Sequence, residues 1–307
     1  RWRLCGMPPP SSGTLAVGQM LGMLETRGIE ALRPRPAPWG LEPDAQAVHL
    51  FSEAGRLAFA DRARYVADPD FAPLPGLGAA TLLDADYLKQ RAALIGPRSM
   101  GRAAAGTPLG PLMSLADDHS PELASTTQVS VVDGFGNALS MTSTIENGFG
   151  AQIMVRGFLL NNQLTDFSFV PAVDGVPVAN RVQGGKRPRS AMAPMLVFER
   201  DGGRLVTSIG SPGGPAIINY VAKALVASLD WELDLQQAVA LPNFGSRNGP
   251  TELEAGRSSS ALADALRARG HDVQVQAQTS GLQGIRRVDS GWFGAADPRR
   301  EGIAAGD

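Results

Sequence analysis

The sequence is poor in the residues that carry most metal and redox chemistry. Its 307 residues include one cysteine, Cys5, and three histidines, His49, His119 and His271. A single cysteine excludes a disulfide within the chain and a zinc site built on a cysteine cluster. So few histidines leave little room for catalysis that depends on a histidine base. We therefore predict neither a metal site nor a cofactor.

Charge of one sign and long apolar runs are also scarce. The 28 Lys and Arg residues nearly balance the 30 Asp and Glu residues, and the formal net charge is -2. This balance does not indicate a protein that binds nucleic acid or an anionic membrane. The longest apolar stretch, residues 216–229, is interrupted by Asn219 and Lys223 and is too short to cross a bilayer. No nucleic-acid partner and no membrane span are predicted.

The chain begins at Arg1, and its opening residues, RWRLCGMPPPSSG, lack the apolar region of a signal peptide. We therefore interpret the chain as a fragment or a processed product. Hydrophobic residues make up 43% of the sequence and charged residues 19%, which is typical of a globular protein with a sizeable core.

Hydrophobic periodicity predicts interleaved helices and strands, which favours a layered α/β or α+β fold. The predicted helices span residues 14–25, 44–66, 84–95, 215–229, 235–241 and 258–269, and the predicted strands span 195–199, 204–209, 273–277 and 284–288. Residues 96–125 are small, polar and rich in Gly and Pro, so we expect an exposed, mobile linker there. We place the main boundary of the chain after Ser125.

A β-hairpin is predicted directly after this boundary, with its turn at Phe135. A symmetric antiparallel register pairs Thr126 with Thr144, Gln128 with Thr142, and Ser130 with Ser140. Alternation places these six polar side chains on one face and Val129, Val131, Leu139 and Met141 on the other. We expect the apolar face to join the core. The polar face is either solvated or part of a site.

The position of Thr126 after a cleavable segment suggests a specific chemistry. A cut between Ser125 and Thr126 would give Thr126 a free α-amine, whose pKa is about 7.7–8.0 in reference peptides. Such an amine can act as a general base for the hydroxyl of the same residue at neutral pH. This chemistry needs no histidine, and it therefore suits a chain that has so few.

Seven blocks of the sequence together resemble the γ-glutamyltransferases. The blocks are MPPPSSG (7–13), HLFSEAGRLAFADR (49–62), TTQVSVVDGFGNALSMTST (126–144), LLNNQLTDFS (159–168), GKRPRSAMAP (185–194), GSPGG (210–214) and AADPR (295–299). The resemblance covers nearly the whole chain. It implies an α+β fold with four αββα layers, that of an N-terminal-nucleophile hydrolase whose precursor cuts itself into a large and a small subunit. Residues 1–125 then resemble the end of the large subunit, and residues 126–307 resemble the small catalytic subunit, the two forming a heterodimer.

The resemblance also implies roles for individual residues. Thr126 matches the nucleophile, Ser125–Thr126 the self-cleaved bond, and Thr144 the residue that hydrogen-bonds the nucleophile. Residues matching those that bind the donor are Glu146, Gln163 and Asp166 at its α-amino group and Ser190 at its α-carboxylate. From the residues alone, the NNQLTD segment is also compatible with a simple Asx-type turn.

The GSPGG turn joins a predicted strand to a predicted helix. It lacks the Lys-Ser/Thr of a phosphate-binding loop. Backbone N–H groups of Gly213 and Gly214 at a helix start suit a developing oxyanion, and the resemblance implies that role. A tight structural turn is equally compatible with the pattern. Lys186, Arg187 and Arg189 either form an anion site or, as we expect, shape the loop that presents Ser190.

The sequence departs from the family pattern at three places. Gln128 replaces the usual His after the TT pair, and Ala191 replaces a second Ser that helps to bind the carboxylate. One such neutral hydrogen bond contributes about 0.5–1.5 kcal/mol. The chain also lacks the amino-terminal part of the large subunit, and with it the arginine that clamps the same carboxylate. We expect poor donor binding by this chain alone.

Three functions remain open from the sequence. The first is transfer of the γ-glutamyl group from an amide such as glutathione to water or to an amino-acid or peptide amine. The second is an acylase that acts on a glutaryl-type amide, as cephalosporin acylases do, and the third is a truncated, inactive relative. The resemblance implies a periplasmic or secreted location, while a cytoplasmic one stays open.

Overall fold

The computed structural model describes residues 1–120 and 126–306, and its centre is a five-stranded antiparallel sheet. Its strands, in spatial order, are β1 (Trp2–Gly6), β10 (Met195–Glu199), β11 (Leu205–Gly210), β15 (Gln283–Val288) and β16 (Gly291–Ala296). Strand β1 pairs with β10 along its whole length. Segments from both sides of residue 125 therefore share one sheet.

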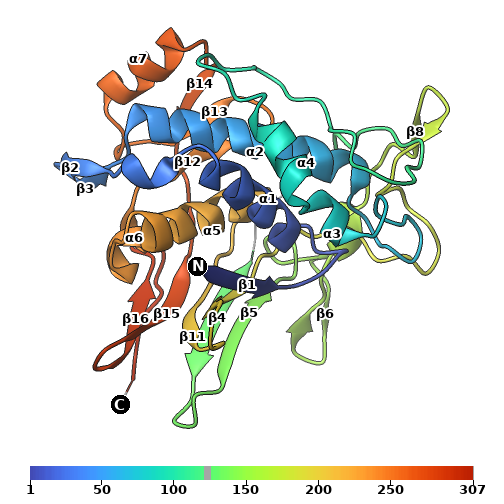
Figure 1. The fold of residues 1–307 in the computed structure, drawn as a ribbon. Coiled ribbons are helices and arrows are strands. Elements are labelled where there is room, and N and C mark those ends of the chain that lie inside the picture. The colour runs from blue at the N-terminus through green and yellow to red at the C-terminus, as the bar shows by residue number, and fades with distance from the viewer. Residues whose placement is uncertain (121–125, 307) are drawn as a thin grey trace.

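Helices cover one face of this sheet (Figure 1). Helices α1 (Gly13–Glu25), α5 (Ile217–Leu225) and α6 (Leu235–Ala240) lie nearest the strands, and α2 (Ala45–Tyr65) packs across α1. Helix α2 begins where the Asp44 side chain accepts a hydrogen bond from the Gln46 N–H at 2.7 Å. Apolar side chains of these helices and of the sheet form one continuous core.

The remaining elements surround this centre. The helices are α3 (Ala79–Leu82), α4 (Ala85–Ala92) and α7 (Ser260–Ala268), together with four short turns of helix, η1 (Ile29–Ala31), η2 (Gln163–Asp166), η3 (Gly214–Ala216) and η4 (Val226–Asp230). A second sheet consists of β12 (Phe244–Ser246), β13 (Thr251–Glu254) and β14 (Val273–Gln276). Three short strand pairs are β2 (Arg35–Ala37) with β3 (Gly40–Glu42), β6 (Met154–Val155) with β7 (Phe158–Leu159), and β8 (Ala172–Val173) with β9 (Val176–Pro177).

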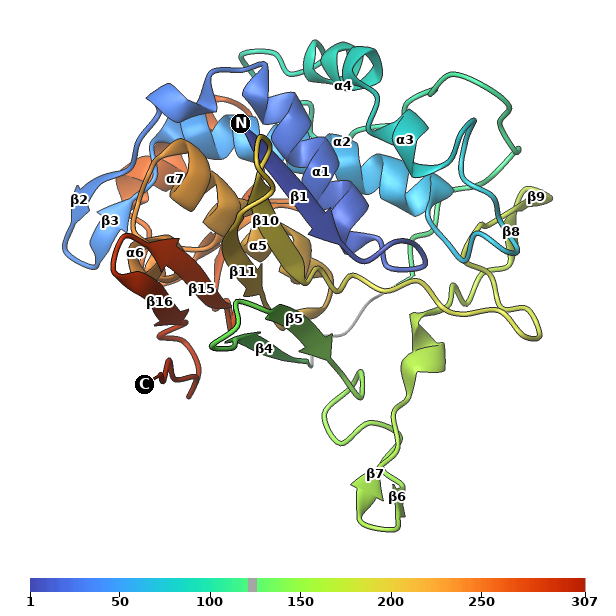
Figure 2. The ribbon, with the colours of Figure 1, turned by 60° about the horizontal axis from the view of Figure 1, so that its bottom comes forward.

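The hairpin of β4 (Thr127–Val132) and β5 (Ala138–Ser143) lies on the other face of the sheet (Figure 2). Its predicted register is confirmed, because Gln128 faces Thr142 and Ser130 faces Ser140. The chain thus provides a helical layer, a full sheet and a hairpin of a second β layer. This arrangement confirms the predicted α+β class.

The prediction that the apolar face of the hairpin joins the core is wrong. The polar face packs against the sheet, where the Ser140 hydroxyl donates to the Ile209 carbonyl at 3.0 Å and the Ser208 hydroxyl donates to the Leu139 carbonyl at 2.9 Å. These bonds satisfy polar groups where the two layers meet. The side chains on the opposite face, Val129, Val131, Leu139 and Met141, are between 38% and 46% exposed.

The segment predicted to be a mobile linker makes specific contacts as far as Ser120. The Met100 N–H donates to the Glu53 carboxylate at 2.8 Å, and Ala116 forms a bridge with Val178. Asp118 is buried and pairs with Arg189 at 3.1 Å. Residues 121–125, which include the predicted cleavage residue Ser125, lie outside the described residues.

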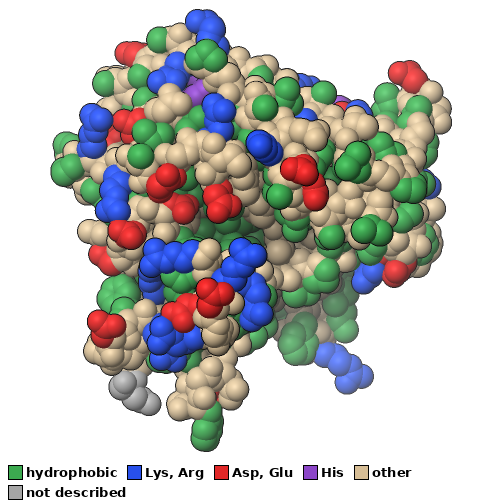
Figure 3. Space-filling model, viewed as in Figure 1, with side chains coloured by type: hydrophobic (Ala, Val, Ile, Leu, Met, Phe, Trp, Pro, Cys, Tyr) green, Lys and Arg blue, Asp and Glu red, His purple; other side chains and the backbone are tan. Residues whose placement is uncertain are grey.

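The surface mixes both signs of charge, as the nearly neutral composition predicts. On the face shown in Figure 3, acidic and basic side chains are interspersed. Among the helices of residues 1–120 and 126–306, none combines the length and the apolar character needed to cross a membrane.

We expect Gly55→Ala to destabilise the protein. A Cβ at Gly55 in α2 would lie 2.6 Å from the backbone oxygen of Ser246 in β12, so the helix must shift. Overpacking of this kind costs about 1–3 kcal/mol, measurable as a lower free energy of unfolding in urea. The control is Gly134→Ala, whose Cβ meets nothing within 4 Å. It should change stability by less than about 0.5 kcal/mol, and equal losses in both variants would contradict the prediction.

Candidate functional site

Thr126 and Thr144 lie opposite each other at the open end of the β4–β5 hairpin. The Thr126 hydroxyl donates to Thr144 Oγ1 at 3.2 Å, and the Glu146 N–H donates to the same oxygen at 2.9 Å. The register derived from the sequence therefore brings the two predicted threonines into contact. The backbone N–H bond orients the Thr144 side chain toward Thr126.

Glu146 reaches the same place through an unusual backbone conformation. Its φ of 74° lies in the left-handed region, which residues other than glycine adopt uncommonly. The side chain is 4% exposed, and its Oε2 accepts a hydrogen bond from Asn162 Nδ2 at 2.6 Å. Strain at a buried acidic residue is typical of functional sites.

Gln163 and Asp166 lie in the short 3-10 helix η2. The Asn161 side chain accepts from the Gln163 N–H at 3.0 Å, so the predicted Asx-type turn is present as well. The Gln163 side-chain amide donates to the Asp166 carboxylate. The side chain of Asn180 holds the Asp166 backbone oxygen at 2.7 Å. The i,i+3 spacing therefore places both predicted side chains in contact.

Ser190 is positioned by the MPPPSSG turn, which is distant in sequence. The Ser190 N–H donates to the Pro10 carbonyl at 3.1 Å, and its own carbonyl accepts from the Ser12 N–H at 2.7 Å. Ser12 is fully buried, and its hydroxyl accepts from Arg62 Nε at 2.7 Å. Ala191 follows Ser190, is buried and offers no hydroxyl group.

The basic residues around Ser190 shape its loop, as expected. Arg187 pairs with Asp68 at 2.6 Å, and the Arg187 side chain holds the pKa of this carboxyl well below its usual range. Arg189 pairs with Asp118. Burial alone would raise the pKa of Asp118, but Arg189 and hydrogen bonds from Ser120 and Asn180 lower it overall.

Gly213 and Gly214 form the turn between β11 and α5. Their φ angles are 138° and 56°, which favour glycine at both positions. A Cβ on Gly213 would also lie 2.7 Å from the Tyr220 ring. Gly214 begins η3 and lines the same cleft as Thr126. The first N–H groups of a helix lack partners within the helix, so they can face a negative charge.

A narrow cleft collects nearly all of the predicted residues. It has a volume of about 30 Å³ and is lined by Thr126, Thr144, Glu146, Gln163, Asp166, Ser190, Ala191, Met192, Gly214 and Ile217. Gly213 is the one predicted site residue with described structure that does not line it. A volume this small accommodates only one or two water molecules.

A larger hollow of about 880 Å³ lies on the other side of Thr126, along β4, β15, β16 and residues 300–306. It is larger, but the acidic and amide side chains of the predicted site line the small cleft instead. Arg300 lines the hollow, and its guanidinium approaches the Thr126 carbonyl at 3.5 Å. The sequence reasoning missed Arg300, although it directly follows the AADPR block. It also missed Met192 and Ile217, whose apolar types carry no chemical signal.

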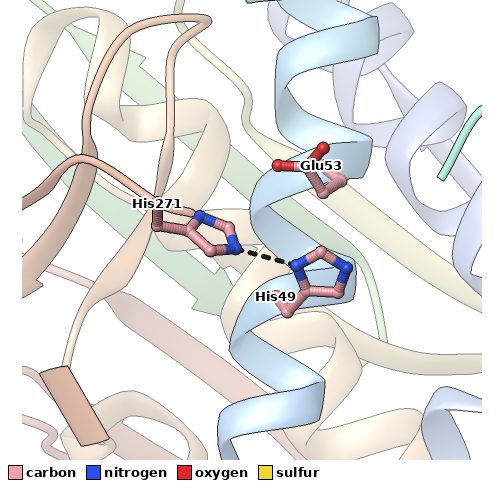
Figure 4. A group of neighbouring side chains, drawn as sticks. All are labelled: His49, Glu53 and His271. Carbon is pink, nitrogen blue, oxygen red and sulfur yellow. Dashed lines mark hydrogen bonds between the residues drawn. The ribbon is translucent and has the colours of Figure 1, made fainter. Parts of the chain in front are cut away.

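His49, Glu53 and His271 form a buried group that has the composition of a metal site (Figure 4). Its ligand atoms are already hydrogen-bonded. His49 Nδ1 lies 2.8 Å from His271 Nε2, and His49 Nε2 lies 2.8 Å from the Gly96 carbonyl. Glu53 accepts from Arg56 Nε at 2.9 Å, from Ser99 and from the Met100 N–H. This arrangement indicates a structural hydrogen-bonded pair rather than a cation site.

The order of the bonds assigns the protons of the two rings. The Gly96 carbonyl can only accept, so His49 Nε2 carries a proton and His49 Nδ1 accepts from His271 Nε2. His271 Nδ1 then accepts from the Thr251 hydroxyl at 2.7 Å. Both rings are neutral in this chain of bonds. Burial lowers the pKa of His49, and burial lowers that of His271 to about 4.

Comparison with known proteins identifies the family. The family model for gamma-glutamyltranspeptidase matches residues 1–307. The chain belongs to the γ-glutamyltranspeptidase family. It is 34% identical to the glutathione hydrolase proenzyme of Pseudomonas aeruginosa, covering 96% of this chain and 51% of that protein. It is 36% identical to the acylase ACY 1 proenzyme of Pseudomonas sp. strain V22, covering 91% of this chain and 45% of that protein.

Two solved structures extend the comparison. Cephalosporin acylase from Bacillus halodurans superimposes with a TM-score of 0.79 at 24% identity, covering 99% of this chain and 51% of that one. A γ-glutamyltranspeptidase mutant from Pseudomonas nitroreducens gives a TM-score of 0.53 at 32% identity, covering 59% of this chain and 98% of that one. These likenesses confirm the predicted N-terminal-nucleophile hydrolase fold. This γ-glutamyltranspeptidase-family chain spans about half the length of the curated relatives it matches.

We expect His271 to make the protein less stable in acid. The unfolded histidine binds a proton near pH 6.5 but the folded one only near pH 4, so this stabilisation is complete above about pH 6.5 and is lost as the pH falls toward 4. In His271→Gln the side chain does not titrate. Its melting temperature should therefore fall less than that of the wild type between about pH 7.5 and about pH 5. Parallel losses in both proteins would contradict this assignment.

Proposed function

We propose that the protein is an autoprocessing threonine hydrolase and acyltransferase that cleaves γ-glutamyl amides such as glutathione. The observation that carries this proposal is the contact between Thr126 and Thr144 in a cleft lined by Glu146, Gln163 and Asp166. A hydroxyl nucleophile with a positioned partner and acidic groups for a substrate ammonium lie together there. Family membership supports the same class of reaction.

The first step of the proposal is self-cleavage of the Ser125–Thr126 bond. The Thr126 hydroxyl attacks the Ser125 carbonyl, the C–N bond breaks, and the acyl group moves to oxygen as an ester. Water then hydrolyses the ester, which leaves a carboxylate on Ser125 and a free α-amine on Thr126. Residues 1–125 and 126–307 would stay together as a heterodimer, since β1 pairs with β10 and both parts share one core.

The share of the chain that matches a separate solved chain supports this boundary. The γ-glutamyltranspeptidase chain from Pseudomonas nitroreducens is covered to 98% by 59% of this chain. Residues 126–307 make up that same fraction of the sequence. The word "proenzyme" in the names of the relatives is consistent with cleavage of a precursor chain.

In the second step the mature Thr126 reacts with the donor amide. Its α-amine accepts the hydroxyl proton, and the Thr126 oxygen attacks the γ-carbonyl. The N–H groups of Gly213 and Gly214 would stabilise the tetrahedral anion, and Thr144 would orient the attacking oxygen. The leaving amine takes the proton. Water or an amino-acid or peptide amine then accepts the γ-glutamyl group from the ester.

The donor's α-amino end would bind between Glu146, Gln163 and Asp166. An ammonium group beside Asp166 forms a hydrogen bond in which both partners are charged, whereas only the carboxylate is charged in the bond that Gln163 now donates. The ammonium would therefore compete with the Gln163 amide for the Asp166 carboxylate. Ser190, which lines the same cleft, would donate to the donor's α-carboxylate.

Thr126→Ala in the natural gene product should abolish both self-cleavage and turnover. Removing a covalent nucleophile lowers kcat by about 10⁴-fold or more. Intact mass and N-terminal sequencing should show cleavage before residue 126 in the wild type and none in Thr126→Ala. The matched control is Thr127→Ala, whose side chain is exposed on the other face of β4 and should leave both steps intact. Cleavage that persists in Thr126→Ala would refute the proposal.

A glutaryl-amide acylase is the second candidate, because an acylase proenzyme is among the similar proteins. Ala191 offers no hydroxyl to the carboxylate that both kinds of donor carry. A glutaryl group lacks the α-ammonium that the acidic side chains of the cleft would bind. Asp166 would therefore contribute to binding of a γ-glutamyl donor but not to binding of a glutaryl donor.

We expect Asp166→Asn to lower kcat/KM for a γ-glutamyl anilide about 10- to 100-fold, since a charged hydrogen bond contributes about 1.5–3 kcal/mol. The same variant should leave any turnover of a glutaryl anilide unchanged. Asp174→Asn, in the exposed β8–β9 turn, is the control and should affect neither substrate. Faster turnover of the glutaryl anilide by the wild type would favour the acylase.

A further inference from the structure

Gln128 lies two residues after Thr126 on the same face of β4 and is 6% exposed. Its carboxamide is held from both strands of the hairpin. The Thr142 hydroxyl donates to Gln128 Oε1 at 2.6 Å, and Gln128 Nε2 donates to Ser140 Oγ at 3.1 Å and to the Val129 carbonyl at 3.0 Å. These bonds fix the rotamer, so the end of the side chain has one position.

That position is directly against Gly210, the last residue of β11. A Cβ built on Gly210 would lie 2.3 Å from Gln128 Oε1, 2.5 Å from its Cδ and 2.7 Å from its Nε2. The backbone of Gly210 does not require glycine through a positive φ. Glycine is therefore required at position 210 because the Gln128 carboxamide leaves no room for a Cβ.

The turn that follows Gly210 has little freedom to compensate for a displacement. Pro212 packs against Gly281, where an added Cβ would lie 2.6 Å from the proline ring. The Ser211 hydroxyl accepts from the Gly281 N–H at 3.3 Å. Gly213 lies against Tyr220. A change in the spacing between β4 and Gly210 would therefore be transmitted to Gly213 and Gly214.

We infer that Gln128 is a positioning residue that sets the gap between the Thr126 strand and the Gly213–Gly214 turn. This inference rests on the proposed function, in which Thr126 attacks and the turn stabilises the anion. The carboxamide, clamped by Thr142 and Ser140, acts as a spacer of fixed thickness on Gly210. An error in the gap misplaces the nucleophile relative to the N–H donors without removing either group.

A double-mutant cycle in the natural gene product tests the spacing. Gln128→Ala leaves the gap unfilled, and Gly210→Ala forces the carboxamide away, so each should lower kcat about 10-fold or more with KM changed less than about 3-fold. In the double variant, the methyl group on residue 210 occupies space that the carboxamide vacated. Its kcat should return to within about 3-fold of the wild type, because the two changes are coupled.

The matched control is Ser130→Ala. Ser130 lies on the same face of β4 and donates to the Gln283 carbonyl at 3.3 Å, away from Gly210, so kcat should stay unchanged. Melting temperatures are measured for every variant, and kinetics are taken below the lowest of them. Gln128→Met is a second test that does not depend on the folding of Gln128→Ala. Methionine keeps the bulk over Gly210 but loses the bonds to Thr142 and Ser140, so its loss of kcat should be smaller than that of Gly210→Ala.

These experiments distinguish a failure of the spacer role of Gln128 from a failure of the proposed function. Additive losses in the double variant, or a Gln128→Met loss as large as that of Gly210→Ala, would overturn the spacer role and leave Thr126 as the nucleophile. Equal losses in Ser130→Ala would also overturn it. A wild-type protein that neither cleaves before Thr126 nor turns over substrate removes the proposed function, and the role of Gln128 with it.

Discussion

The candidate site depends on the antiparallel pairing of β4 with β5. This pairing brings Thr126 and Thr144 within 3.2 Å and turns the polar face of the hairpin toward the central sheet. Hydroxyl groups of Ser140 and Ser208 then bond to backbone carbonyls across the interface. A slip of one residue would move all these groups to the opposite face, so the register controls both the packing and the proposed chemistry.

The two parts of the chain, on either side of residue 125, are joined by a strand pairing and by buried polar contacts. Strand β1 completes the sheet beside β10, the MPPPSSG turn holds Ser190, and the His49–His271 pair links α2 to the segment before β14. Buried polar groups of this kind are costly when they lack partners. Such contacts would hold the two subunits together in a fixed geometry after a backbone cut, as the proposed heterodimer requires.

Much of the local structure could be predicted from the sequence. The helices at 14–25 and 44–66 and the strand at 195–199 are confirmed as α1, α2 and β10. Strand β1 was missed, since its sequence has mixed polarity and it forms only by pairing with β10. The orientation of the hairpin was predicted wrongly, because alternation shows that two faces differ but not which one a neighbouring sheet will cover.

The hairpin register and the family could be predicted before folding is considered, because side-chain alternation and seven ordered motifs are properties of the chain alone. Which residues meet at the cleft depends on how the layers pack. Ser190 reaches it only through the turn at residues 8–12, and Gln128 meets Gly210 only because the hairpin packs on β11. Contacts between segments so distant in sequence depend on how the layers stack, which no local pattern encodes.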